Sequence, residues 1–394
     1  MKKAVMYGAG NVGRGFLGQL FAESGYEVVF VDIVPELLAA LNAKGSYRLL
    51  LVSNEGEQEI QVRNVRAVDG RDAQCVATEL ADADLAATAV GASVLPRIAP
   101  VVAAAIVQRA QATPSRPLNI IICENLKDAA SIFRGMLESH VPDPYKGFLS
   151  EQVGLVEAVI GRMVPIVPPE LQKKDPSLIL AEPYKVLPVD RDGFVGPIPN
   201  IVGMEPHDRF VAYVDRKLYI HNAGHAVLAY LGYLKGWTYG YEALADPDIY
   251  PWLRRALDES QKALVAHHGL DVAALRAHVD DLLARFGNRA LGDTIYRLGR
   301  DPLRKLGPTD RLVGAANLAL AHGITPLGLA TGIAAGLAFD HPDDPRAVEL
   351  QRRLAAQGLD AVLQEVCGIE PTGALASLVK KRHALVRTGR HWQA

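Results

Sequence analysis

Residues 3–32 decide the fold, and they read KAVMYGAGNVGRGFLGQLFAESGYEVVFVD. The run at 3–7 is short and apolar, as is typical of a strand, and the run at 27–32 is β-branched and ends in an acid. Between them lies a glycine turn followed by apolar residues at helical spacing, namely Phe16, Leu17, Leu20 and Phe21. Strand, turn, helix and strand within about thirty residues form a complete βαβ unit.

The turn carries the pattern Gly8-x-Gly10-x-x-Gly13, and Asp32 follows nineteen residues after Gly13. A lone pattern of this kind can be a plain glycine-rich turn, but here a strand precedes it and a helix follows it. The glycines permit a tight turn and close approach to a pyrophosphate at the positive end of the helix. A carboxylate at the end of the second strand accepts hydrogen bonds from ribose hydroxyls and repels a 2′-phosphate. The sequence therefore predicts a dinucleotide site that favours NAD over NADP.

The predicted cofactor contacts come from this turn, from the acid and from a turn after a later strand, where residues 88–91 would lie near the nicotinamide. They are Tyr7, Gly8, Ala9, Gly10, Asn11, Val12, Gly13, Arg14, Asp32, Val90 and Gly91. Arg14 has two open roles, a contact to the phosphates or a solvated surface position.

Further apolar runs at 85–90 and 119–123 are separated by helix-like segments, which indicates a parallel sheet covered on both faces. A proline-rich region at 165–206 is typical of a crossing segment or a small accessory sheet. After about residue 208 the pattern becomes helical. We expect an α/β chain with an N-terminal Rossmann-type doubly wound sheet in 1–200 and a mainly α-helical domain in 201–394.

The composition is that of a soluble globular protein. The chain has 394 residues, 49% of them apolar and 22% charged, with a net charge of -2 that argues against a nucleic-acid partner. Three scattered cysteines form neither a disulfide framework nor a zinc site. The uncharged stretch 315–339 is long enough to span a bilayer, but its polar residues and glycines favour two buried helices with a break near 323–326. We expect a cytoplasmic monomer without a membrane partner.

Residues 215–234 read DRKLYIHNAGHAVLAYLGYL and bring together Lys217, Asn222 and His225. On one α-helix, His225 lies about 80° and Asn222 about 140° around from Lys217, so that all three can border one cleft. Hydride transfer from an alcohol needs a base for the hydroxyl proton and donors for the developing oxyanion. A lysine serves as that base when burial and nearby positive charge lower its pKa. The alternative is a snorkelling lysine on a helix packed through its polar side chains.

Two other patterns overlap this stretch. His221 and His225 stand four residues apart, but the motif HNAGH lacks the acid of HExxH and a clear third ligand, so no metal is predicted. Tyr213 and Lys217 match the YxxxK pair of short-chain dehydrogenases, whose TGxxxGxG turn is absent from the first βα loop. We interpret this second match as chance.

Three motifs, in order, resemble the polyol-specific long-chain dehydrogenases: YGAGNVGRGFLG, the Lys217–Asn222–His225 set followed by AYLG, and RFGNRALGDTIYRLGRDPLRKLGPTDRL. The resemblance runs essentially from end to end. It implies an N-terminal Rossmann domain, a helical C-terminal domain and metal-independent, NAD-dependent interconversion of D-mannitol 1-phosphate and fructose 6-phosphate. The alternatives are a relative acting on free mannitol or a hexuronate, and a non-catalytic NAD-binding protein.

The resemblance also implies roles for single residues. Lys217 resembles the general base, and Asn222 and His225 match the residues that bind and polarise the reacting oxygen. Asn125, in the loop CENL, is the candidate for a second asparagine donor, with a helix cap as the alternative. Some relatives carry a relay acid three positions before the lysine; here that position is Val214, and Asp215 is a weak substitute.

A phosphorylated substrate needs positive charge. Seven basic residues lie within 285–311, which is unusual in a chain of net charge -2. We predict that Arg300 and Lys305 hold the phosphate. The alternative is a solvated network in which the basic residues pair with Asp293, Asp301 and Asp310.

Overall fold

The computed structural model describes residues 1–389 and divides into two compact units, Met1–Phe210 and a second that begins at Val211. The division falls at residue 210, ten residues after the expected boundary at 200.

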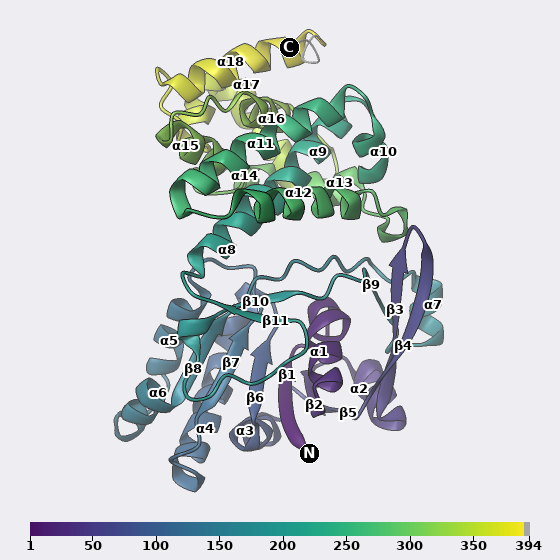
Figure 1. Ribbon diagram of the computed structural model, residues 1–394, viewed down its shortest axis with the longest axis vertical. Helices are drawn as coiled ribbons and strands as arrows, with labels where there is room; N and C mark the ends of the chain where they lie inside the picture. The colour runs from purple at the N-terminus through teal and green to yellow at the C-terminus, as the bar shows by residue number, and fades with distance from the viewer. Residues whose placement is uncertain (390–394) are drawn as a thin grey trace. The chain divides into compact units, whose positions relative to one another are not determined.

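The first unit is built on a six-stranded parallel sheet with the order β5-β2-β1-β6-β7-β8 (Figure 1). The strands are β1 (Lys2–Tyr7), β2 (Tyr26–Asp32), β5 (Val65–Asp69), β6 (Leu85–Thr88), β7 (Leu118–Ile122) and β8 (Val153–Glu157). The strand order reverses between β1 and β6, where Tyr7 pairs with Thr88 at the carboxyl ends of both strands. In such sheets this reversal marks the crevice in which ligands bind. The predicted Rossmann-type sheet is confirmed.

Helices cover both faces of this sheet, as the apolar strands require. On one face, α3 (Ala73–Asp82), α4 (Leu95–Ala112), α5 (Ala129–Glu138) and α6 (Lys146–Gln152) share a buried core with the strands. On the other face, α1 (Gly18–Glu23) packs on β2, and α2 (Pro35–Lys44) follows β2 in the chain. The stretch Ala92–Ala112, which includes α4, is the one helix among the described residues that is long and apolar enough to cross a membrane. Its inner side chains lie in the core of the sheet.

Two smaller sheets complete the first unit. The hairpin of β3 (Ser46–Ser53) and β4 (Gly56–Arg63) takes up β9 (Ile179–Ala181), and β10 (Leu187–Asp190) pairs with β11 (Met204–His207). The proline-rich region thus supplies accessory strands, as one of its two interpretations predicted, together with the short α7 (Pro169–Lys174).

The named secondary-structure elements in the described part of the second unit are all helices, as expected. Its helices are α8 (Val211–Arg216), α9 (Ala223–Leu234), α10 (Gly240–Ala245), α11 (Ile249–His268), α12 (Val272–Phe286), α13 (Ile295–Gly299), α14 (Pro302–Lys305), α15 (Val313–Ala321), α16 (Leu327–Leu337), α17 (Pro345–Glu365) and α18 (Ala374–Arg387). The uncharged stretch 315–339 forms α15 and α16, with the chain breaking between them around Gly323. Both helices are largely buried, so the prediction of two buried helical pieces is confirmed.

Candidate active site

The glycine turn after β1 has room for a ligand where the motif requires it. A Cβ on Gly13 would lie 1.9 Å from the carbonyl oxygen of Gly8, and one on Gly8 would lie 2.5 Å from that of Ala89. A Cβ on Gly10 would meet nothing within 4 Å, and Gly10 and Asn11 are exposed. Two glycines therefore close the turn tightly, and the third faces open space. This is the cradle that a dinucleotide pyrophosphate requires.

Asp32 is held beside this turn at the end of β2. Its Oδ2 accepts the N–H of Ala9 at 2.8 Å, and its Oδ1 accepts the N–H of Ile33 at 2.8 Å. The side chain is only partly buried. An acid fixed by the turn and open to solvent has the geometry for ribose hydroxyls.

Arg14 differs from both of its predicted roles. It is buried, its Nε donates to the carbonyl of Ala9 at 2.6 Å, and its Nη1 donates to that of Ser177 at 2.6 Å. The solvated-surface alternative is wrong, and these contacts do not support the predicted role as a phosphate ligand. The side chain instead ties the dinucleotide turn to the segment that leads into β9.

The loops after β6 and β7 are joined by a residue that the sequence analysis did not single out. Glu124 is buried, and its carboxylate accepts the N–H of Val90 at 2.9 Å and that of Gly91 at 2.8 Å. Asn125 follows it and is exposed. Because α5 begins at Ala129 with Asp128 at its N-cap, the helix-cap alternative for Asn125 is wrong.

In the second unit, Lys217 and Asn222 begin and end a π-helical segment, η5 (Lys217–Asn222), inserted between α8 and α9. The i→i+5 hydrogen bonds of a π-helix bring residues five apart onto the same side, and such insertions are frequent at functional sites. The angle of about 140° expected for Asn222 on an α-helix is therefore wrong. His225 follows Asn222 by three positions in α9, so that all three side chains share one side. All three are partly exposed, whereas the neighbouring Ile220, His221, Ala223 and Gly224 are buried.

The charges and burial around Lys217 suit a lysine that acts as a general base. Burial, with the positive charge of Arg311 as a second cause, lowers the pKa of Lys217 to about 8. Burial also lowers the pKa of His225 well below its usual value, and Arg311 and Lys305 lower it further. At neutral pH His225 is thus an uncharged imidazole, which can donate one hydrogen bond.

Three other features of this stretch concern the alternative interpretations. The rings of His221 and His225 meet edge to face at 4.9 Å, and residues 1–389 contain no group of three or more His, Cys, Asp or Glu side chains able to hold a metal. The ring of Tyr213 packs under the guanidinium of Arg216 at 4.6 Å. Asp215, the weak substitute for a relay acid, is already engaged by an ion pair with His268 at 2.9 Å.

The basic segment 285–311 contains several ion pairs. Asp293 pairs with Arg297, Asp301 with Arg304, and Asp310 with both Arg304 and Arg311, so part of the alternative network exists. Lys305 is buried and donates to the backbone carbonyl of Leu298. Burial lowers its pKa to about 7, with Arg311 as the next cause. Arg300 is exposed.

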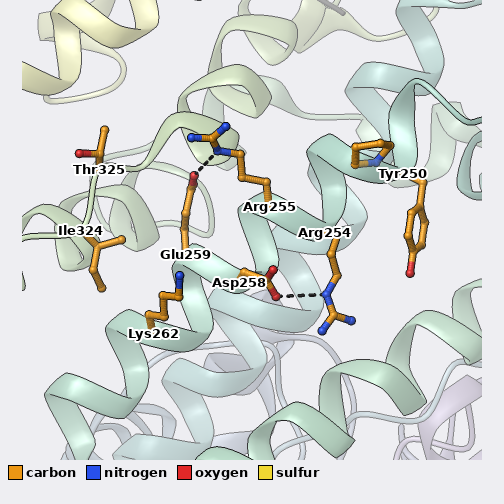
Figure 2. Close-up of a pocket in the computed structure, with 9 residues that line it drawn as sticks. Tyr250, Arg254, Arg255, Asp258, Glu259, Lys262, Ile324 and Thr325 are labelled. Carbon is orange, nitrogen blue, oxygen red and sulfur yellow. Dashed lines mark hydrogen bonds and ion pairs between the residues drawn. The ribbon is translucent and has the colours of Figure 1, made fainter. Parts of the chain in front are cut away.

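A separate groove of about 730 Å³ is lined by residues of α11 and of the turn between α15 and α16 (Figure 2). Its lining includes Arg254, Asp258, Arg255 and Glu259, which form the pairs Arg254–Asp258 and Arg255–Glu259. Glu259 also accepts the N–H of Gly328 at 2.8 Å. Glu259 therefore holds α11 to the start of α16, and none of the predicted catalytic side chains is among the residues that line the groove.

Comparison with known proteins matches both units. The Rossmann domain model of mannitol dehydrogenase covers residues 2–203, and its C-terminal domain model covers residues 209–381. A mannitol-1-phosphate 5-dehydrogenase of Brevibacillus brevis is 38% identical over 379 residues, which is 96% of this chain and 97% of that protein.

Two solved structures share the fold at low sequence identity. The mannitol 2-dehydrogenase of Pseudomonas fluorescens, in a ternary complex with NAD and D-mannitol, is 18% identical with a TM-score of 0.77, over 99% of this chain and 92% of that one. A substrate-free D-sorbitol dehydrogenase is 17% identical with a TM-score of 0.81, over 99% and 94% of the two chains.

Proposed function

Because this chain belongs to the mannitol dehydrogenase family, we propose that it is an NAD-dependent oxidoreductase that interconverts D-mannitol 1-phosphate and D-fructose 6-phosphate. The choice of a phosphorylated substrate rests on the 38% identity, over 96% of this chain, to a mannitol-1-phosphate 5-dehydrogenase, and the charge around His225 is consistent with it. The pKa of His225 is lowered by burial and then by four positive side chains, Arg311, Lys305, Arg285 and Arg297. Positive charge therefore converges on the proposed catalytic helix, as an anionic substrate requires.

Lys217 is the proposed general base. Bound NAD takes up or supplies the hydride. During oxidation, the Nζ of Lys217 accepts the proton of the reacting hydroxyl, and during reduction it returns that proton to the oxygen. A pKa of about 8 makes both steps accessible near neutral pH.

Asn222 and the neutral His225 are the proposed donors to the reacting oxygen. Because these two side chains lie on the same side of the helix as Lys217, one oxygen atom can contact the base and both donors. Hydrogen bonds aimed at this oxygen stabilise the negative charge that develops on it. Asn125, on the first unit, stays a predicted additional donor.

Lys305 is the proposed phosphate ligand, with Arg300 and Arg311 contributing. Both arginines lower the pKa of Lys305, so their charges act at the position of its ammonium group. A phosphate dianion would offset this repulsion and restore the full charge of Lys305. The glycine turn and Asp32 are the proposed cofactor site.

The remaining expectations stay proposals. We propose a metal-independent cytoplasmic monomer whose partners are its small-molecule substrate and cofactor, without nucleic acid or membrane. The nearly balanced charge of 42 basic and 44 acidic residues supports the exclusion of nucleic acid.

The test is an NADH-oxidation assay on fructose 6-phosphate, with unphosphorylated fructose and fructuronate in parallel and Lys217→Ala as the control. We expect turnover only with the phosphorylated sugar, and its loss in the variant. Comparable rates on free fructose or fructuronate would contradict the phosphate assignment. Bound NADH without turnover on any of the three would favour either a substrate outside this set or a non-catalytic NAD-binding protein.

A further inference from the structure

Glu124 stands where the loops after β6 and β7 meet. Thr88 and Ile122 pair at the carboxyl ends of these strands, and the N–H of Cys123 donates to the carbonyl of Thr88 at 2.9 Å. The carboxylate of Glu124 then bridges back to Val90 and Gly91, 34 and 33 residues earlier in the chain. We propose that Glu124 is a positioning residue that holds the loop at 89–91 against the nicotinamide end of bound NAD.

The chemistry of the contact favours a carboxylate. Two successive backbone N–H groups point at one side chain, and each meets a separate oxygen of Glu124. Gly91 has a φ of 91°, which L residues rarely adopt, and it precedes the short η2 (Ala92–Val94) that leads into α4. Consecutive N–H groups in such a turn form a concavity that binds anions. In this chain the anion is Glu124, so these donors are occupied and the pyrophosphate is left to the turn at 8–13.

The position on the sheet points to the nicotinamide rather than the adenosine end. In a doubly wound sheet the dinucleotide crosses the carboxyl ends of the strands, with its pyrophosphate at the turn after β1. Asp32, at the end of β2, takes the adenosine side, and the loops after β6 and β7 lie on the opposite side of β1. The loop after β6 also packs against the turn, since a Cβ on Gly8 would lie 2.5 Å from the carbonyl oxygen of Ala89. Holding this loop therefore shapes the nicotinamide half of the site.

The test compares two ligands that differ only in the part Glu124 is proposed to affect. ADP-ribose contains the adenosine, pyrophosphate and second ribose of NADH but lacks the nicotinamide. In Glu124→Gln one carboxylate oxygen becomes an NH₂ group, which opposes a backbone N–H instead of accepting it. We expect the Kd of NADH to rise about tenfold and the Kd of ADP-ribose to stay within about twofold of the wild type.

Glu157→Gln is the matched control. Glu157 lies at the end of β8, is partly buried, and accepts one backbone N–H, from Ala130 at 3.0 Å. We expect both Kd values to be unchanged in this variant. An unchanged Kd of NADH in Glu124→Gln would overturn the proposal, and so would an equal loss of affinity for both ligands, because that result reports a general fold defect. If Glu124→Gln fails to fold, Glu124→Asp, whose shorter side chain cannot reach both donors, is judged by the same two Kd values.

The inference rests on the use of NAD in the proposed function but not on the substrate. If the wild type leaves fructose 6-phosphate unreduced, the proposed reaction fails, and the comparison of NADH with ADP-ribose still decides the role of Glu124.

Discussion

The phenyl ring of Phe286 lies stacked against the imidazole of His225, with ring centroids 3.9 Å apart and an interplanar angle of 22°. His221 meets the same imidazole edge-on, at 75°. Gly224 leaves space for this arrangement, since a Cβ there would lie 3.1 Å from Phe286. The plane of the proposed oxygen donor is therefore set by aromatic packing. Burial, and then nearby positive charge, favour its uncharged form.

Phe286→Leu should separate this orienting role from simple packing. Leucine keeps apolar volume but removes the flat surface, so we expect kcat for ketose reduction to fall about tenfold while the KM for NADH is unchanged. Phe339→Leu is the control, because Phe339 is also a buried phenylalanine and packs on Tyr233 at 4.6 Å, away from the proposed donors. Steady-state kinetics of both variants make the comparison. Equal losses in the two would assign Phe286 to the core alone.

The pH dependence should follow Lys217, whose pKa is lowered to about 8 by burial and Arg311. Reduction needs the protonated ammonium, so its kcat/KM should fall as pH rises through about 8. Oxidation needs the neutral amine, so its kcat/KM should rise through the same pH. Rate profiles in both directions between pH 6 and about 10 test this. Profiles that slope the same way in both directions would remove Lys217 from the role of base.

Arg311→Gln should raise the pH at which kcat/KM for reduction falls to half its maximum. Removing a positive charge lessens the repulsion felt by the Lys217 ammonium, so its pKa rises and reduction stays active to higher pH. Arg304→Gln is the matched control: Arg304 also pairs with Asp310 but is not among the causes that shift the pKa of Lys217. An upward shift of equal size in both variants would mean that the loss of an Asp310 partner, and not the charge of Arg311, sets the pKa.

Lys305 should take up a proton when a phosphorylated ligand binds. Its pKa is lowered to about 7 by burial, so it is mostly neutral in the free protein at pH 8. A nearby dianion stabilises the ammonium and raises this pKa, so protons are taken up and affinity weakens as pH increases above about 7. Titration calorimetry with fructose 6-phosphate in two buffers of different ionisation enthalpy measures the uptake. In Lys305→Met we expect the uptake to vanish and the KM for fructose 6-phosphate to rise about ten- to a hundredfold.

The sequence predicted secondary structure best where burial of one face requires apolar residues at regular spacing. The βαβ unit and the long helices of the second unit follow from apolar spacing alone. The hairpin was missed because β4, which reads GEQEIQVR, is mostly exposed and has no apolar run. The strand β8 was missed as well; it is five residues long and its burial depends on neighbours that are distant in the chain.

The site shows the same limit more sharply. Lys217, Asn222 and His225 were found because they lie close together in the sequence, but the π-helical turn that aligns them has no apolar period to reveal it. Phe286 and Glu124 were missed because their partners, His225 and the pair Val90 and Gly91, meet them only through the tertiary fold. A lone acid between Cys123 and Asn125, directly after an apolar strand, was the available signal for Glu124.

Two substitutions in the glycine turn, Gly13→Ala and Gly10→Ala, should separate the effect of the turn on stability from its effect on cofactor binding. In Gly13→Ala the new Cβ would lie 1.9 Å from the carbonyl oxygen of Gly8, so the turn must open. We expect a stability loss of about 1–3 kcal/mol together with the loss of NADH binding.

In Gly10→Ala the Cβ meets no protein atom within 4 Å, so stability should be unchanged. The same methyl group occupies the space that a pyrophosphate needs, so NADH binding should still weaken strongly. Thermal unfolding and NADH fluorescence titration measure the two effects. Normal NADH affinity in Gly10→Ala would show that the pyrophosphate lies elsewhere than on this turn.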